Sequence, residues 1–337
     1  MNNKIIVSIV VPVYSGELYL NKLFDRINQL RTLWKNEDAP IEVGELIFVD
    51  DNSIDNSLNI IKEISFNNSW VNYITMSKNF GQHASTIAGI LHSSGNWIVT
   101  LDEDLQHPPE NIENLLHKAI TENLDIVYAS SNNGPHGTIS RDLTSVLFKR
   151  IMLLLTGDKN IPLYNSFRLI RGEIARSASS VCAHDTYFDV SLSWFTNAVG
   201  KYNMNLSDTR NFDGKKSGYS FFKLFSHARK LLMSTRIRLY RLIILLGVTV
   251  FVFGLFYSGL IFINEFMHPG KYGSRGWPSL IITTMIFGST TIILLSIILE
   301  YISLISLKAQ GKPVFFVINR NIPIEISNYF KSKYGNC

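Results

Sequence analysis

Short apolar runs alternate with amphipathic runs through roughly the first 130 residues, and this alternation narrows the folds open to the chain more than any other feature. Residues 5–11 are mostly β-branched, which is typical of a strand buried on both faces of a parallel sheet. From Glu17 to Leu30 apolar residues recur at helical spacing, which predicts a helix. Further strands are predicted at residues 45–49, 71–75, 97–101 and 126–129, and further helices at residues 58–64, 82–92 and 111–122. This order predicts an α/β fold with a doubly wound, mostly parallel sheet.

Polar residues cluster directly after the second, third and fourth predicted strands. In a doubly wound sheet ligands bind beyond the carboxyl ends of the strands, so we expect these clusters to share one site. They comprise Asp50 and Asp51, then Lys78, Asn79 and Gly81, and finally Asp102, Asp104 and Gln106. The phosphate-binding sequences G-x-G-x-x-G and GK[ST] are absent, which disfavours a Rossmann dehydrogenase or a P-loop NTPase.

Asp102 and Asp104 lie one residue apart at the end of the segment WIVTLDED. Side chains alternate along an extended backbone, so both carboxylates are expected to face the same way and to converge on one hard cation. Such an ion, held by one or two carboxylates with water and phosphate oxygens in its other positions, commonly grips a nucleoside diphosphate. The pair therefore predicts a Mg²⁺ or Mn²⁺ site, with a solvated acidic turn as the structural alternative.

The other two clusters offer groups that could contact the rest of a nucleotide. Asp50 and Asp51 can accept hydrogen bonds from a base N–H or a ribose hydroxyl, but helix capping by Asp51 or Ser53 explains the same pattern. Lys78 precedes a predicted helix, where a lysine and free backbone amides can meet a phosphate.

Four segments in this order, VVPVY, FVDDNSIDNS, SKNFGQHASTIAGI and TLDEDLQHPPE, resemble the GT-A glycosyltransferases of family two. The resemblance is to the branch that loads a sugar onto a polyprenyl phosphate, such as dolichyl-phosphate mannose synthases and undecaprenyl-phosphate glucosyl and aminoarabinosyl transferases. It covers roughly residues 5–240 and extends to the apolar segments beyond. It implies a UDP- or GDP-linked sugar donor, with the nucleoside held by Pro12, Tyr14, Asp50 and Asp51, and the metal and diphosphate by Asp102, Asp104 and Gln106.

The residues expected to bind the acceptor phosphate are identified by the same resemblance. Residues 138–155 predict an amphipathic helix with Arg141 and Ser145 one turn apart on one face. The resemblance implies that this pair grips the acceptor phosphate, through the planar fork of the arginine and the serine hydroxyl. It also makes Arg168, in the segment FRL, a candidate contact for that phosphate. A solvated helix face and an ordinary ion pair are the structural alternatives.

The chemistry implied is a single displacement with inversion. A phosphate monoester is already an anion near neutral pH, so it needs no strong general base. Asp104 and Arg141 are then the expected catalytic groups, through charge neutralisation and positioning. Asp185 lies about where other family-two enzymes place an acidic base, although a carboxylate at a helix start explains it equally well.

Three positions depart from the family pattern. Relatives commonly read Pro-x-Tyr-Asn-Glu after the first strand, whereas here Glu17 is shifted by one residue. Residues 129–131 read Ala-Ser-Ser where relatives often carry Gly-x-Arg, and Ser166 stands where an acidic residue often precedes Phe-Arg-Leu. These changes bear on acceptor contacts and sugar specificity more than on the reaction class.

The last third of the chain predicts membrane attachment. Residues 242–263 and 277–299 are uncharged stretches of about 22 and 23 residues, each long enough to cross a bilayer as a helix, with a buried core pair as the alternative. Residues 215–241 carry eight Lys or Arg and no Asp or Glu, which predicts interfacial helices on anionic headgroups rather than a nucleic-acid site. The basic flanks place both ends in the cytoplasm by the positive-inside tendency.

The expected organisation is therefore a cytoplasmic catalytic domain (1–212), amphipathic juxtamembrane helices (213–241), a two-helix transmembrane hairpin (242–303) and a cytoplasmic tail (304–337). We expect an inverting polyprenyl-phosphate glycosyltransferase on the cytoplasmic face of the inner membrane, and leave a homo-oligomer open. A membrane synthase with a saccharide acceptor is the first alternative, although the Q-x-x-R-W sequence usual in such processive enzymes is absent. An inactive scaffold with the same fold is the second.

Overall fold

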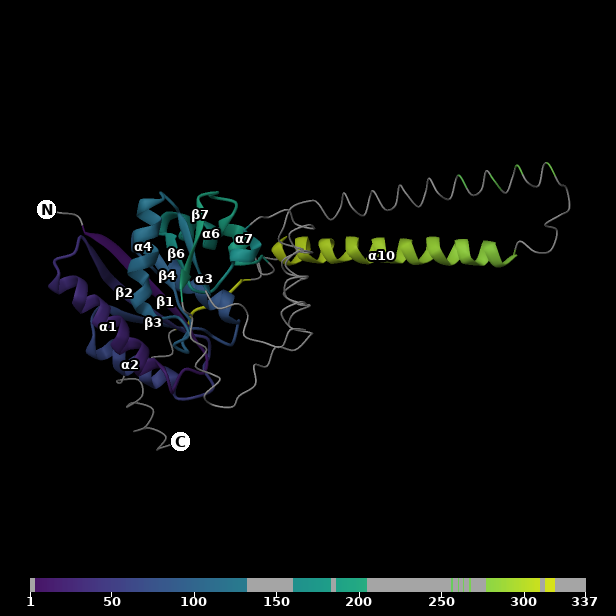
Figure 1. Ribbon diagram of the computed structural model, residues 1–337. Helices are drawn as coiled ribbons and strands as arrows, with labels where there is room; N and C mark the ends of the chain where they lie inside the picture. The colour runs from purple at the N-terminus through teal and green to yellow at the C-terminus, as the bar shows by residue number, and fades with distance from the viewer. Residues whose placement is uncertain are drawn as a thin grey trace, which may run out of the picture.

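The computed structural model contains a seven-stranded sheet with helices packed around it (Figure 1), and the strand order is β3-β2-β1-β4-β6-β5-β7. The structure describes residues 4–131, 160–182, 186–204, 277–309 and 313–318, together with Phe256, Leu260, Ile263 and Met267. The strands are β1 (Ile5–Val13), β2 (Ile41–Asp50), β3 (Val71–Thr75), β4 (Trp97–Thr100), β5 (Ile126–Ser131), β6 (Arg168–Arg171) and β7 (Val199–Met204).

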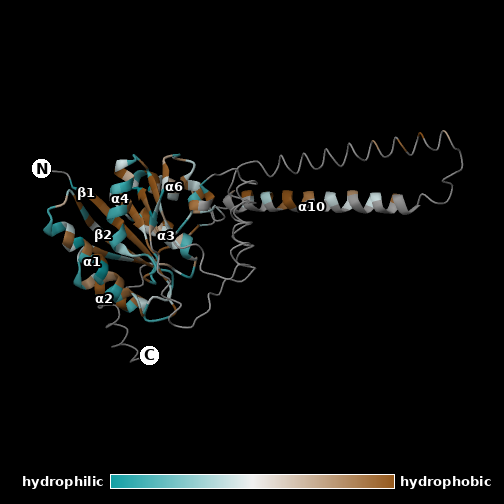
Figure 2. Cartoon of the chain, in the orientation of Figure 1, coloured by the Kyte–Doolittle hydropathy of each residue, from teal (hydrophilic) through white to brown (hydrophobic). Residues whose placement is uncertain are grey.

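Helices cover both faces of the sheet. One face packs against α1 (Leu20–Asn36), α2 (Ser57–Asn67) and α4 (Ile112–Thr121), and the other against α3 (Gln82–Leu91), α6 (Gly172–Val181) and α7 (Phe188–Leu192). Two short 3₁₀ turns are η1 (Pro109–Asn111) and η2 (Ile161–Leu163). In Figure 2 the apolar strands lie between helices whose outer faces are polar.

Strand β1 shows why the sheet is the core of the domain. Val7, Ile9 and Val11 belong to the apolar cluster on one face, and Val10 belongs to the cluster on the other. All four are fully buried. The strand therefore needs apolar residues at nearly every position, which explains the continuous run in its sequence.

The five predicted strands and four predicted helices are confirmed, with shifted ends. The first helix begins at Leu20 and not at Glu17. Leu18 lies in the turn before the helix, where its side chain is 78% exposed. Strand β4 ends at Thr100, one residue before the predicted end. The sheet is mostly parallel as predicted, but β6, which the sequence pattern did not predict, runs antiparallel between β4 and β5.

Helix α10 (Trp277–Ala309) contains the second predicted membrane span, and Figure 1 shows it projecting away from the sheet. Several of its apolar side chains are exposed, among them Leu280, Leu295, Leu299 and Ile305. Within the part of the chain that the structure describes, however, no helix has both the length and the apolar character to cross a membrane. The juxtamembrane residues 213–241 and nearly all of the first predicted span lie outside the described residues.

Candidate active site at the carboxyl edge of the sheet

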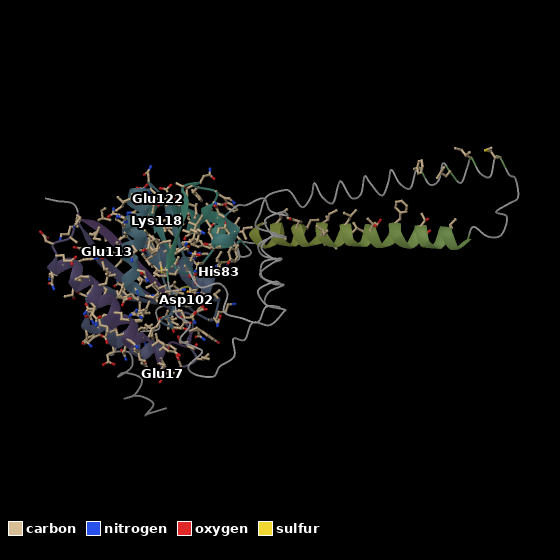
Figure 3. All side chains as sticks on the ribbon, viewed as in Figure 1. Glu17, His83, Asp102, Glu113, Lys118 and Glu122 are labelled. Atoms are coloured by element: carbon tan, nitrogen blue, oxygen red, sulfur yellow. The ribbon has the colours of Figure 1, made fainter. Side chains whose placement is uncertain are left out.

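The predicted site residues gather at one edge of the sheet because β2, β1 and β4 are parallel neighbours. Val13 at the end of β1 is in register with Asp50, and Val10 is in register with Thr100. The segments that follow these three strands therefore leave the sheet at the same edge, as the sequence predicted. In Figure 3 the charged side chains on α4 lie well away from Asp102.

Asp102 is held on both carboxylate oxygens by neutral groups. The side-chain amide of Gln82 donates to Oδ1 at 2.5 Å, and the hydroxyl of Ser166 donates to Oδ2 at 2.9 Å. The backbone N–H of Asp102 donates to Nδ1 of His107, whose ring stacks on Phe167 with 5.1 Å between the ring centroids. The side chain remains 26% exposed, so the carboxylate is oriented and still open on one side. His107 is thus a buried turn residue.

Asp104 lies in a turn and not on the strand, which corrects the expectation that strand alternation aligns the two carboxylates. Strand β4 ends at Thr100, and Leu105 then adopts a φ of 62° while only 6% exposed. A leucine rarely adopts this left-handed conformation, and such strain is typical of functional turns. The backbone N–H of Gln106 donates to Oδ1 of Asp104 at 3.3 Å. The turn therefore sets the direction of Asp104.

Glu103, between the two aspartates, is a site residue that the sequence analysis missed. Its carboxylate accepts hydrogen bonds from the backbone N–H groups of Tyr14 (3.0 Å) and Ser15 (3.1 Å), and so ties the turn after β1 to the turn after β4. Burial raises the pKa of Glu103 to about 7, against the two backbone hydrogen bonds that lower it. A Cβ on Gly16 would lie 2.6 Å from Oε2 of Glu103, so a larger residue there would require this carboxylate to shift. The middle position of D-x-D carries no sequence signal for such a role.

Asp50 and Asp51 accept hydrogen bonds from local donors, but neither Asp51 nor Ser53 caps a helix, because the N-caps are Asn56 for α2 and Gly81 for α3, each without a side-chain cap. Asp50 is 1% exposed and accepts from the backbone N–H and hydroxyl of Ser53. Asp51 is 3% exposed and accepts from the backbone N–H groups of Phe80 (2.7 Å) and Gly81 (2.8 Å). Burial raises the pKa of Asp51. Both carboxylates thus shape the edge of the sheet, with little surface for a ligand.

Lys78 is exposed in the segment of residues 77–81, here called the Lys78 loop, which Asp51 holds through the N–H groups of Phe80 and Gly81. Its ammonium group lies 5.0 Å from the centre of the Phe80 ring, a cation–π contact. The loop ends at Gly81, whose φ of 90° is readily adopted by glycine alone, and α3 begins at the next residue. An exposed lysine next to a helix start remains a suitable contact for a phosphate. Of the other proposed nucleoside contacts, Pro12 is buried in β1 and Tyr14 is 38% exposed.

Arg168 is not placed to bind an acceptor phosphate, which corrects that expectation. Its guanidinium pairs with Asp189 and lies 4.8 Å from the centre of the Phe188 ring, and the residue is 3% exposed. The hydroxyl of Tyr128 donates to the same carboxylate oxygen at 2.8 Å. Desolvation opposes the charge of Arg168, but the neighbouring Asp189 raises its pKa. The ordinary ion pair, here a buried one, is therefore the correct interpretation.

A group of half-buried aromatic residues lies near the hydrogen-bond partners of Asp102 in the chain. His83 packs on Tyr187 with ring centroids 4.7 Å apart, and Tyr187 stacks on Tyr164 at 6.1 Å. His83 follows Gln82 in the chain, and Tyr164 precedes Ser166 by two residues, so two members of the group adjoin the hydrogen-bond partners of Asp102. Their polar tips and ring faces are the kind of surface that a ligand pocket uses.

The carboxylates at this edge are of the chemical type that binds a hard divalent cation. Among the described residues, no three His, Cys, Asp or Glu side chains gather closely enough to hold a metal on their own. The partly exposed carboxylates of Asp102 and Asp104 nevertheless suit an ion that takes its other oxygens from water and phosphate. Arg141, Ser145 and Asp185 lie outside the described residues.

Comparison with known proteins agrees with this arrangement. The sequence profile of glycosyl transferase family 2 matches residues 8–178. A Bacillus subtilis protein described as an uncharacterized glycosyltransferase, YkcC, is 28% identical over 342 residues, covering 99% of each chain. An undecaprenyl-phosphate 4-deoxy-4-formamido-L-arabinose transferase from Shewanella sediminis is 28% identical over 312 residues, covering 92% of this chain and 91% of that protein.

Among solved structures, mannosyl-3-phosphoglycerate synthase from Rubrobacter xylanophilus shares the fold. It aligns with a TM-score of 0.50 at 13% identity, over 68% of this chain and 72% of that one. The sheet, the polar groups at its carboxyl edge and a family profile that spans half of the sequence lead to one conclusion. The chain belongs to glycosyl transferase family 2.

Proposed function

We propose that the protein transfers one sugar from a nucleotide-sugar donor to a polyprenyl phosphate, with inversion and with a divalent metal. The observation that carries this proposal is the turn with Asp102 and Asp104 at the shared carboxyl edge of three strands. Asp102 is oriented there by Gln82 and Ser166 and remains open on one side. Carboxylates so oriented and accessible suit the diphosphate end of a nucleotide sugar.

The acceptor class rests on the relatives and on the sequence. The Shewanella protein is described as an undecaprenyl-phosphate sugar transferase, and its similarity extends over 92% of this chain, well past the catalytic domain. Arg141 and Ser145 are the proposed contacts for the acceptor phosphate, because an arginine fork and a hydroxyl suit a phosphate monoester.

The chain's own groups would contribute positioning and charge. Asp102 and Asp104 would hold Mg²⁺ or Mn²⁺, which when bound neutralises the departing nucleoside diphosphate. Lys78 would add positive charge beside the phosphates, and the aromatic group of His83, Tyr164 and Tyr187 would flank the sugar ring. The acceptor phosphate is already ionised, so its alignment behind the anomeric carbon matters more than removal of a proton.

We further propose that the enzyme works at the cytoplasmic face of the inner membrane. The uncharged stretches at residues 242–263 and 277–299 and the basic residues of 215–241 support this location. A polyprenyl phosphate carries its phosphate at the membrane surface, so a catalytic domain attached beside the bilayer would meet that phosphate without extracting the lipid.

The test is a transfer assay with the full-length protein in membranes. Labelled UDP- and GDP-sugars are supplied with undecaprenyl phosphate, with a saccharide acceptor or with neither, each with and without a chelator. The proposal predicts label in an acid-labile lipid fraction that requires both undecaprenyl phosphate and metal. Transfer only to the saccharide or to a growing polymer would favour the synthase instead, and no turnover with any donor would favour an inactive scaffold.

A further inference from the structure

The chain returns to the sheet after α10 and extends it at one edge. Residues 313–318, here called the return segment, lie beside the end of β3. Three backbone interactions join the two: the antiparallel bridge between Met76 and Val317, the hydrogen bond from the N–H of Ser77 to the carbonyl of Phe316 (2.9 Å), and that from the N–H of Ile318 to the carbonyl of Thr75 (2.9 Å). The return segment thus pairs with the last residues before the Lys78 loop.

Side chains of the return segment differ sharply in their packing. Val314, Phe315 and Val317 pack against the apolar cluster on the α3 face of the sheet. Phe316 points outward and is 57% exposed, so it contributes to the attachment through its backbone carbonyl. Of the two adjacent phenylalanines, Phe315 therefore packs against the domain, whereas the side chain of Phe316 is exposed.

The Lys78 loop is held at both of its ends. At its start Ser77 is bonded to the return segment, and at its far end the N–H groups of Phe80 and Gly81 are bonded to Asp51. Phe80 packs against the same apolar cluster as the return segment. Between these attachments, Lys78 and Asn79 are exposed. The position of Lys78 therefore depends on a segment more than 230 residues later in the sequence.

We propose that the return segment is a positioning element of the donor site, which fixes the Lys78 loop for the phosphates of a nucleoside diphosphate. This inference rests on the proposed function, because it takes the Lys78 loop as a donor contact. A loop that has lost one of its two attachments is less ordered in the free protein. Ordering it when the ligand binds costs free energy, so the ligand binds more weakly. The effect expected is a loss of affinity on the order of tenfold.

The test compares Phe315→Ala with Phe316→Ala in the full-length protein. Affinity for UDP and GDP is measured by titration with Mn²⁺ present, and exchange of the Ser77 amide is followed by hydrogen–deuterium exchange mass spectrometry. We expect Phe315→Ala to bind nucleotide on the order of tenfold more weakly and to exchange faster at Ser77. Phe316→Ala should match the wild type in both measurements. Thermal unfolding of both variants separates a local from a global effect.

A second variant tests the attachment without removing a packed aromatic ring. Ile318→Pro lacks the N–H that donates to Thr75, and should also weaken nucleotide binding and speed exchange at Ser77. Wild-type affinity and exchange in both Phe315→Ala and Ile318→Pro would overturn the inference and leave the proposed function standing. Failure of the wild type to bind either nucleotide would overturn the proposed function, and the inference with it.

Discussion

The side-chain amide of Gln82 donates a hydrogen bond of 2.5 Å to Oδ1 of Asp102. Gln82 is the first residue of α3, so this bond links the helix that follows the Lys78 loop to the turn that carries the two aspartates. Gln82 and Ser166 are neutral donors, so they orient Asp102 without forming an ion pair with it. Each carboxylate oxygen also keeps a lone pair for a cation.

Removal of either hydrogen-bond donor to Asp102 should lower the apparent affinity of the enzyme for Mn²⁺. In Gln82→Ala and Ser166→Ala we expect the Mn²⁺ concentration for half-maximal transfer to rise by about 10- to 100-fold, the range seen for groups that orient metal ligands. The measurement is a metal titration of the transfer assay. Asn59→Ala removes an exposed amide on α2 and serves as the control. Unchanged metal dependence in both site variants would show that they do not support Asp102.

Asp104→Asn should abolish transfer without unfolding the protein. Asparagine keeps the Oδ1 atom that accepts from the N–H of Gln106, so the turn is preserved while the charge is lost. We expect the transfer rate to fall by at least about 100-fold, with an unchanged thermal midpoint. Near-normal turnover in this variant would exclude Asp104 from the site.

We expect Arg168 to stabilise the fold and not to contact the lipid acceptor. Because Arg168 and Asp189 form a buried pair, Arg168→Met leaves an uncompensated charge on Asp189 and should lower the free energy of unfolding by about 3–5 kcal/mol. Urea denaturation measures this loss. A variant that keeps wild-type stability but loses affinity for the lipid acceptor would instead support the phosphate contact that the sequence suggested.

Asp51 should make stability depend on pH. Its pKa is raised in the folded protein, mainly by burial, so the fold favours the protonated form. The stabilisation is fully present below the ordinary value of 3.8 and is lost as pH rises through the folded pKa. Asp51→Asn removes this titration and leaves a backbone N–H without its acceptor, at a cost of about 1–3 kcal/mol.

The expected result is that the stability difference between wild type and Asp51→Asn narrows as pH rises from about 4 toward neutrality. Urea denaturation of both proteins at several pH values measures that difference. A difference that stays constant or widens over this range would contradict the raised pKa.

The first half of the fold was predictable because local pattern and burial agree there. Val7, Ile9 and Val11 face one apolar cluster while Val10 faces the other, and a run of β-branched residues signals such a strand. Strand β6 was not predictable in this way, since it has only four residues with an arginine at each end. Its place between β4 and β5 depends on long-range pairing that no local window contains.

The site was predictable in its location and less so in its details. Parallel strands bring Asp102 and the residues after β1 and β2 to one edge, which follows from the alternation alone. The partners of Asp102, however, come from α3 and from the residue before Phe167. The buried pairing of Arg168 depends on Asp189, which is 21 residues away. Such contacts are set by packing, so sequence spacing does not reveal them.

The most direct test of the central claim measures the binding of UDP and GDP to the purified full-length protein. Wild type and Asp104→Asn are each titrated with nucleotide, once with Mn²⁺ present and once after chelation. The account predicts that at least one nucleotide binds the wild type with metal, and that chelation or the substitution weakens binding by about tenfold or more. Nucleotide binding that is as strong in the variant or after chelation as in the wild type with Mn²⁺, or no binding to the wild type at all, would contradict it.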